Sequence, residues 1–148
     1  MKEFTIRQAT LADADALQEC MMAAYSVYLE TLKEISLPPL EVDYASEILN
    51  YPTWVAQREG KIVGGLIMTF EESCAVVSNI AVHPAAQGIG LGRALLVFAE
   101  QQARTKEITR MRLATHVLLT GNVSLYQHLG WNVVDQDSVR ITMEKQIS

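Results

Sequence analysis

Apolar positions along the chain recur with two periods, and each period predicts one kind of element. Alternating positions and short apolar runs bounded by turn residues predict strands, whereas apolar residues three and four positions apart predict helices. Thr10 is the expected N-cap of the first helix, and Asp13 completes a variant of the capping box. Pro38 and Pro39 break that helix, and the second helical stretch ends before Pro52. The expected strands cover about 4–8, 53–58, 61–70, 75–82, 110–115, 131–134 and 139–143, and the expected helices cover about 11–29, 42–49, 91–104 and 122–130.

The order of these elements predicts one mixed α/β domain over residues 1–148. Glu59 and Gly60 are a two-residue turn signal, which predicts a hairpin between the strands on either side. The run 62–68 is nearly all apolar, as expected of a strand that is covered on both faces. The 148 residues leave no length for a second domain, and the sequence contains no internal repeat, low-complexity tract or linker.

Composition and charge narrow the classes of function. Hydrophobic residues make up 49% of the chain and charged residues 20%, which is ordinary for a globular protein. The net charge of -5 and the absence of clustered Lys and Arg disfavour nucleic acid as a partner. The same charge weakly favours a cationic substrate through long-range attraction, although it is more simply explained by solubility.

We expect a cytoplasmic protein that does not bind a membrane. No apolar run approaches the roughly 20 residues that span a bilayer, and the first residues lack the apolar region of a signal peptide. Cys20 and Cys74 are too few for a disulfide framework and lack metal-site spacing. Reduced, inert thiols and no bound metal are therefore expected.

A glycine-rich loop, from Gln87 to Gly92, separates an expected apolar strand from an expected amphipathic helix. Glycines let the backbone approach a ligand, and the start of a helix offers unpaired N–H groups and about half a positive charge. The loop therefore suits a phosphate or pyrophosphate, although a tight turn that binds nothing has the same pattern. The sequence contains no Gly-Lys-Ser/Thr of a P-loop, and Arg93 stands where a dinucleotide fingerprint has its third glycine. Both nucleotide-binding motifs are therefore disfavoured.

Three segments in order resemble one known family. The loop Gln87-Gly88-Ile89-Gly90-Leu91-Gly92 resembles the acetyl-CoA loop of the GNAT superfamily of N-acetyltransferases, Arg/Gln-x-x-Gly-x-Gly/Ala. The segment 80–84 is similar to the end of that family's fourth strand, and residues 122–131 are similar to its downstream Asn, Leu-Tyr and Leu-Gly-aromatic motif. Residues 6–10 and Asp13 also fit, so the resemblance covers essentially the whole chain.

The resemblance implies a mixed, mostly antiparallel central sheet of about seven strands flanked by about four helices. It also implies a gap beside the fourth strand, into which the pantetheine arm of acetyl-CoA inserts. The backbone of Ile80 and Val82 would face this cofactor, with the Ile80 N–H donating to the thioester carbonyl. The residues that the resemblance assigns to acetyl-CoA binding are Ile80, Ala81, Val82, Gln87, Gly88, Ile89, Gly90, Leu91, Gly92, Arg93 and Asn122.

Tyr126 is the catalytic residue that the resemblance indicates. The thiolate that leaves when an amine attacks a thioester must gain a proton, and a phenol can donate one. The alternative is that the ring only packs on the short helix beside Leu129. Asn122 is expected to N-cap this helix, and the family places it near the pantetheine amides.

The motifs do not identify the general base. Several family members carry a glutamate on the fourth strand, where Val76 and Ser78 stand here. A water molecule is one candidate, and a structural role is favoured for each of the candidate side chains, Glu71, Glu72, His83 and His116. The acceptor pocket is expected to form from the first helices and the loop between them, including Tyr25, Tyr28, Pro38 and Pro39.

The sequence therefore predicts an acetyl-CoA-dependent N-acetyltransferase. The acceptor would be a primary amine of a small molecule, a peptide or a protein, which attacks directly in a ternary complex. The alternative is a non-catalytic acyl-CoA-binding or regulatory module on the same fold, because the strand carboxylate is missing and a fold alone does not define a function. The prediction leaves room for a homodimer.

Overall fold

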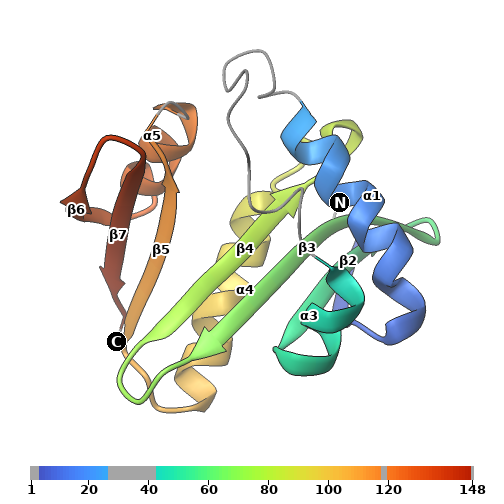
Figure 1. Ribbon diagram of the computed structural model, residues 1–148, viewed down its shortest axis with the longest axis horizontal. Coiled ribbons are helices and arrows are strands. Elements are labelled where there is room, and N and C mark those ends of the chain that lie inside the picture. The colour runs from blue at the N-terminus through green and yellow to red at the C-terminus, as the bar shows by residue number, and fades with distance from the viewer. Residues whose placement is uncertain (1–3, 27–42, 118–119, 148) are drawn as a thin grey trace.

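The computed structural model describes residues 4–26, 43–117 and 120–147. In these residues the chain forms a seven-stranded sheet, four α-helices and two short 3-10 helices (Figure 1). The predicted α/β architecture is therefore confirmed in this part of the chain. In chain order the elements are β1 (Thr5–Gln8), η1 (Leu11–Asp13), α1 (Ala14–Ser26), α3 (Tyr44–Asn50), β2 (Thr53–Arg58), β3 (Lys61–Phe70), β4 (Ala75–Val82), η2 (Pro84–Ala86), α4 (Leu91–Thr105), β5 (Arg110–His116), α5 (Thr120–His128), β6 (Asn132–Gln136) and β7 (Arg140–Gln146).

The strands lie side by side in the order β1-β2-β3-β4-β5-β7-β6. Every neighbouring pair is antiparallel except β4 and β5, which run parallel, so the sheet is mixed and mostly antiparallel as predicted. The connection from β4 to β5 contains helix α4, because parallel neighbours require a long crossover. Glu59 and Gly60 close the β2–β3 hairpin with φ values of 51° and 78°, at the turn that the sequence predicted.

Helices cover both faces of the sheet around β3 (Figure 1). Ile67 of β3 packs in one core cluster with Leu17 of α1, whereas its neighbour Leu66 packs in the other cluster with Leu91 of α4. Both faces of β3 are therefore buried, which explains its nearly continuous apolar sequence. At Gly65 an added Cβ would lie 2.5 Å from the Leu17 Cδ1 atom, so the glycine allows α1 to approach β3 closely.

Strands β4 and β5 are paired over a short stretch only. Their three residue pairs run from Ala75 to Val77, which lies opposite Leu113. The register of β4 against β3 shifts at the next residue, so Ser78 is the extra residue of a β-bulge. A bulge bends its strand and increases the local twist. Beyond Val77 the two strands diverge, which confirms the gap predicted beside the fourth strand (Figure 1).

The start of the helix over the downstream motif differs from the prediction. Helix α5 begins at Thr120, so Asn122 lies inside its first turn and the expected N-cap role of Asn122 is wrong. The error arises because Gly121, a weak helix former in isolation, takes part in this helix. The first helix begins as the 3-10 turn η1, and α1 extends to Ser26. Three of the residues expected in the acceptor pocket lie outside the described residues, namely Tyr28, Pro38 and Pro39.

None of the described helices is long and apolar enough to cross a membrane. Among the residues that the structure describes, no three His, Cys, Asp or Glu side chains are grouped so that they could hold a metal ion. Cys20 and Cys74 are buried free thiols. Burial raises the pKa of Cys20 to about 11, so this thiol stays protonated at neutral pH.

An ion pair fixes the start of the first helix to strand β1. Two guanidinium nitrogens of Arg7 donate to the two carboxylate oxygens of Asp13, at 2.8 and 2.9 Å. The same carboxylate accepts the Thr10 backbone N–H at 2.8 Å, as the predicted capping box requires. The hydrogen bonds from Arg7 lower the pKa of Asp13 to about 2, and partial burial opposes this effect.

We expect Asp13→Asn to lower the free energy of unfolding by about 2 kcal/mol at neutral pH, because a carboxylate pKa lowered to this extent stabilises the folded state. The folded-state pKa lies below the unfolded value of 3.8, so the stabilisation is complete above about pH 4 and is lost as the pH falls toward 2. Urea unfolding at pH values from about 7 to about 3 should show wild type and variant converging. Asp15→Asn is the control, because Asp15 is exposed. A difference that does not change with pH would contradict the ion pair.

Candidate active site

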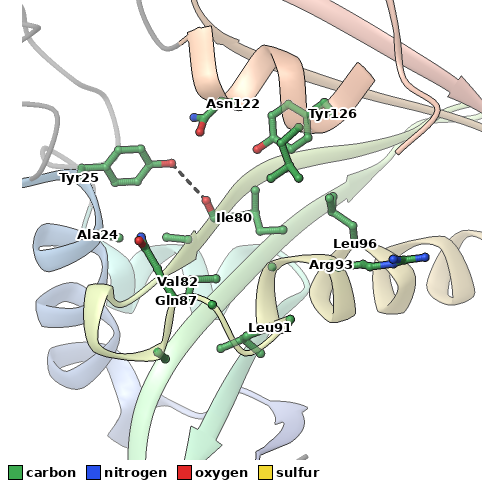
Figure 2. A pocket seen from close by; sticks show the side chains of 16 residues that line it. Ala24, Tyr25, Ile80, Val82, Gln87, Leu91, Arg93, Leu96, Asn122 and Tyr126 are labelled. Carbon is green, nitrogen blue, oxygen red and sulfur yellow. Dashed lines mark hydrogen bonds between the residues drawn. The ribbon is translucent and has the colours of Figure 1, made fainter. Parts of the chain in front are cut away.

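A cavity of about 390 Å³ opens beside β4, where that strand diverges from β5 (Figure 2). The end of α1, the end of β4, the glycine loop with the start of α4, and α5 form its walls. Of the residues predicted to bind acetyl-CoA, Ile89 is not in the lining, and its side chain is 40% exposed. The lining residues are Ala24, Tyr25, Ile80, Ala81, Val82, Ala86, Gln87, Gly88, Gly90, Leu91, Gly92, Arg93, Leu96, Asn122, Leu125 and Tyr126.

Ile80 and Val82 present their backbone groups to this cavity. The His83 N–H donates to the Val63 carbonyl of β3 at 2.8 Å, which continues the β3–β4 ladder past the end of β4. Residues that bond to the partner strand alternate with residues that point away from it. The N–H and C=O groups of Ile80 and Val82 therefore point away from β3. Because β4 pairs with β5 only as far as Val77, these groups face the cavity.

The glycine loop brings backbone N–H groups to the opposite wall. Gly88 and Gly90 have φ values of 86° and 83°, which residues with a Cβ rarely adopt. Gly90 is the N-cap of α4, whose first N–H groups have no partner within the helix. Burial of Leu91 in the core fixes the direction of this helix start. With Gln87 and Arg93 also in the lining, the loop suits an anion such as a pyrophosphate.

Tyr126 lines the cavity from helix α5. Figure 2 shows its hydroxyl end turned toward the side on which Ile80 and Tyr25 lie. The centre of its ring lies 6.4 Å from the ring centre of Trp131, which is buried. The backbone N–H of Trp131 also donates to the backbone carbonyl of Tyr126 at 2.9 Å. The ring of Tyr126 thus packs against the core while its hydroxyl end faces the cavity, and Asn122 lines the cavity one helical turn earlier.

Polar side chains connect the cavity to α1 and α3. The Tyr25 hydroxyl is 3.2 Å from the Ile80 carbonyl oxygen and 3.3 Å from Asn79 Oδ1, and both oxygens accept from it. The Asn79 amide nitrogen donates to the hydroxyl oxygen of Tyr44 at 3.2 Å. Burial raises the pKa of Tyr44 to about 12, so it stays a neutral phenol. Tyr25, predicted for the acceptor pocket, therefore lies in the cavity wall next to β4.

The side chains considered as general base lie elsewhere. Glu71 and Glu72 belong to the β3–β4 turn, at the opposite end of β4 from the cavity, and Glu71 lies 3.7 Å from an arginine of β5. His83 accepts the N–H of residue 85 through Nδ1 at 3.0 Å and lines a separate hollow between α1 and the β2–β3 hairpin. His116 is the last residue of β5. None of the four is among the described residues that line the cavity beside β4.

Sequence reasoning missed four apolar residues of the cavity wall, Ala24, Ala86, Leu96 and Leu125. Leu125 precedes Tyr126 in the Leu-Tyr pair of the downstream motif, and this position could have identified it as a residue of the cavity wall. Leu96 is 3% exposed and belongs to the core cluster of α4 while it also borders the cavity. No local pattern separates these two roles, because both fall on the apolar side of one helix.

The geometry supports three chemical tasks. An extended chain with amide groups can bond along the unpaired edge of β4, as an additional strand would. A phosphate group can bind at the start of α4. The phenol of Tyr126, which lines the cavity from α5, can donate a proton into it.

Comparison with known proteins gives a consistent result. The sequence pattern of the acetyltransferase (GNAT) family matches residues 16–131. The uncharacterised N-acetyltransferase YjgM of Escherichia coli K12 is 28% identical over 138 residues, which cover 88% of this chain and 83% of the relative. An L-methionine sulfoximine/L-methionine sulfone acetyltransferase of Salmonella typhimurium is 32% identical over 104 residues, which cover 62% of this chain and 57% of the relative.

Solved structures share the fold. The PaiA N-acetyltransferase of Thermoplasma acidophilum, in complex with coenzyme A, matches with a TM-score of 0.86 and 21% identity, over 98% of this chain and 99% of that one. The ribosomal-protein-S18-alanine N-acetyltransferase of Escherichia coli matches with a TM-score of 0.78 and 22% identity, over 98% and 94% of the two chains. At sequence identities this low, the two matches show a shared fold and nothing more.

Proposed function

Because this chain belongs to the acetyltransferase (GNAT) family, we propose that it transfers an acetyl group from acetyl-CoA to a primary amine, which attacks directly in a ternary complex. The observation that carries this proposal is the cavity itself, where the unpaired edge of β4 lies between a helix start and a phenol. The proposed acceptor is an amine of a small molecule, a peptide or a protein.

Each part of acetyl-CoA has a proposed place on the cavity walls. The amides around Gly88 and Gly90, together with the start of α4, would hold the pyrophosphate. The outward backbone groups of Val82 would bond to the amides of the pantetheine arm, with Asn122 opposite them, and the Ile80 N–H would face the thioester end of the arm. A solved relative of the same fold contains coenzyme A, which supports this placement.

The reacting groups would meet at Ile80. When the amine nitrogen bonds to the thioester carbon, the carbonyl oxygen gains negative charge, and the Ile80 N–H would donate to that oxygen. The bound nitrogen passes its extra proton to water, the carbon–sulfur bond breaks, and the departing sulfur takes a proton from a donor that water then reprotonates. Tyr126 would supply this proton, because its hydroxyl end faces the same region of the cavity (Figure 2).

Release of the free thiol of coenzyme A tests this function directly. Acetyl-CoA is incubated with the protein and a panel of primary amines, and the acetylated product is identified by mass. We expect thiol release that requires both the protein and an amine. If no amine of the panel raises the rate of thiol release above the rate without amine, that result would contradict acetyl transfer to an amine.

We expect Gly90→Val to weaken acetyl-CoA binding about tenfold or more. A branched residue resists the φ of 83° at this position and would place its methyl groups where the phosphate binds. Isothermal titration calorimetry measures the affinity. Gly60→Val is the matched control, because Gly60 has a φ of 78°, also has open space around its Cβ position, and lies outside the cavity. Equal losses of affinity in both variants would count against a phosphate site at the loop.

We expect Tyr126→Phe to lower kcat roughly 100-fold, the usual effect of removing a positioned acid. The ring remains, so stability should fall by about 1 kcal/mol at most and acetyl-CoA affinity should hold. Steady-state kinetics and calorimetry measure the two effects. Tyr51→Phe is the control, because Tyr51 is 45% exposed and is not part of the cavity lining. Turnover near that of wild type in Tyr126→Phe would remove Tyr126 from the mechanism.

A further inference from the structure

Helix α5, which carries Tyr126, is held in place by few buried side chains. None of the described side chains over 121–128 is buried. Val123, Tyr126 and Leu129 are half-buried against the core cluster that includes α4, and Trp131, which follows the helix, is buried. Figure 1 shows α5 beside β5 and β7. Helices in proteins owe most of their stability to packing of an apolar face, so a helix with so little buried surface depends on further contacts for its position.

Lys145 of β7 makes such a contact at the end of α5. Its Nζ atom donates to the backbone carbonyl of Leu129 at 2.9 Å. Leu129 follows the last residue of α5, where carbonyl groups have no partner within the helix and a positive charge complements the helix dipole. Gly130, with a φ of 98°, turns the chain and leaves room for the lysine, because an added Cβ would lie 3.4 Å from the Lys145 Cε atom.

The same ammonium group is bound to α4. Lys145 Nζ lies 2.9 Å from Oε2 of Glu100, and the two side chains are only 22% and 13% exposed. Solvent and salt therefore screen this pair less than an ion pair on the open surface. Arg104, one turn farther along α4, lies 3.4 Å from the other carboxylate oxygen of Glu100. Lys145 thus joins β7, the end of α5 and the middle of α4 at one point.

Helices α4 and α5 carry two groups whose relative position matters in the proposed reaction. Helix α4 begins at the loop that would hold the pyrophosphate, and α5 carries the phenol that would protonate the departing sulfur. The Tyr126 carbonyl accepts the backbone N–H groups of Leu129 and Trp131 at 3.1 and 2.9 Å, so Tyr126 moves with the end of the helix. A proton donor must lie within hydrogen-bonding distance of its acceptor, and a misplacement of about 1 Å can cost about 100-fold in rate.

We propose that Lys145 is a positioning residue for acetyl transfer. By binding the Leu129 carbonyl and the Glu100 carboxylate together, it holds the Tyr126 hydroxyl at the distance that the departing sulfur requires. Lys145 is not among the described residues that line the cavity, so it acts through α5 and does not contact acetyl-CoA. The inference rests on the proposed function, and within it on the role of Tyr126 as proton donor.

We expect Lys145→Met to lower kcat roughly 10-fold with the amine of the panel that gives the fastest thiol release, because the phenol is no longer held in place. Methionine keeps an unbranched chain over Gly130 but cannot donate. Acetyl-CoA affinity, measured by calorimetry, should change less than about twofold, because the bound groups lie elsewhere. Lys145→Arg should retain most of the rate, because a guanidinium can donate to both oxygens. Lys106→Met is the matched control, because Lys106 lies beyond the end of α4, over the ring of Phe70.

A double-mutant cycle with Tyr126→Phe distinguishes positioning of the phenol from a general structural role. The positioned hydroxyl is absent in Tyr126→Phe, so adding Lys145→Met should lower kcat less than about twofold further. A purely structural role would lower kcat by the same factor in both backgrounds, and that result would overturn the inference. Turnover near that of wild type in Lys145→Met would also overturn it. Thermal unfolding checks that each variant is folded.

Glu100→Gln carries the same cycle from the side of α4 if Lys145→Met does not fold. The amide oxygen can still accept from Lys145, but the negative charge is lost. We expect kcat to fall roughly threefold when Tyr126 is present and to stay unchanged in the Tyr126→Phe background, because the weaker contact acts only through the phenol. Equal effects in the two backgrounds would overturn the inference here as well.

The wild-type rates separate this inference from the proposed function. Thiol release that no amine of the panel accelerates would overturn the proposed function and the positioning role with it. Acetyl transfer in which Tyr126→Phe turns over like wild type would support transfer to an amine and overturn the positioning role of Lys145.

Discussion

Beyond Val77, strand β4 has a hydrogen-bonding partner along one edge only, because β5 has already turned away from it. Backbone N–H and C=O groups inside a protein need partners, so such an edge must be satisfied by side chains, water or a ligand. The bulge at Ser78 creates the edge, and Tyr25 satisfies part of it by donating to the Ile80 carbonyl. The site thus originates in an interruption of backbone pairing, and the same interruption supplies the groups that a pantetheine arm would use.

The other walls of the site are held in place by packing around this edge. Gly65 allows α1 to lie close to β3, which brings Tyr25 within hydrogen-bonding distance of β4. On the other face, burial of Leu91 fixes the start of α4 beside the cavity. The ion pair between Arg7 and Asp13 anchors the beginning of the first helix to β1. Packing changes on either face would therefore shift ligand-binding groups relative to β4.

Local patterns predicted most of the described elements, because apolar runs bounded by turn residues mark the strands and apolar spacing marks α1 and α4. The strands over 61–70 and 75–82 have the predicted bounds, since turn residues mark both ends. The bulge at Ser78 and the position of β7 between β5 and β6 depend on pairing between distant segments, which no local pattern contains. The expectation of a gap and the role proposed for Tyr126 came from the resemblance to a family. Leu96 was missed because the same apolar face of α4 serves both the core and the cavity.

The proposed reaction requires the acceptor amine to be neutral when it attacks the thioester. An ammonium ion must lose a proton before its nitrogen can attack, and an adjacent carboxylate would stabilise the charged form and raise the pKa of the amine. No Asp or Glu is among the described residues that line the cavity. A site of this kind places less demand on a strong base beside the thioester, which agrees with the absence of a glutamate on β4.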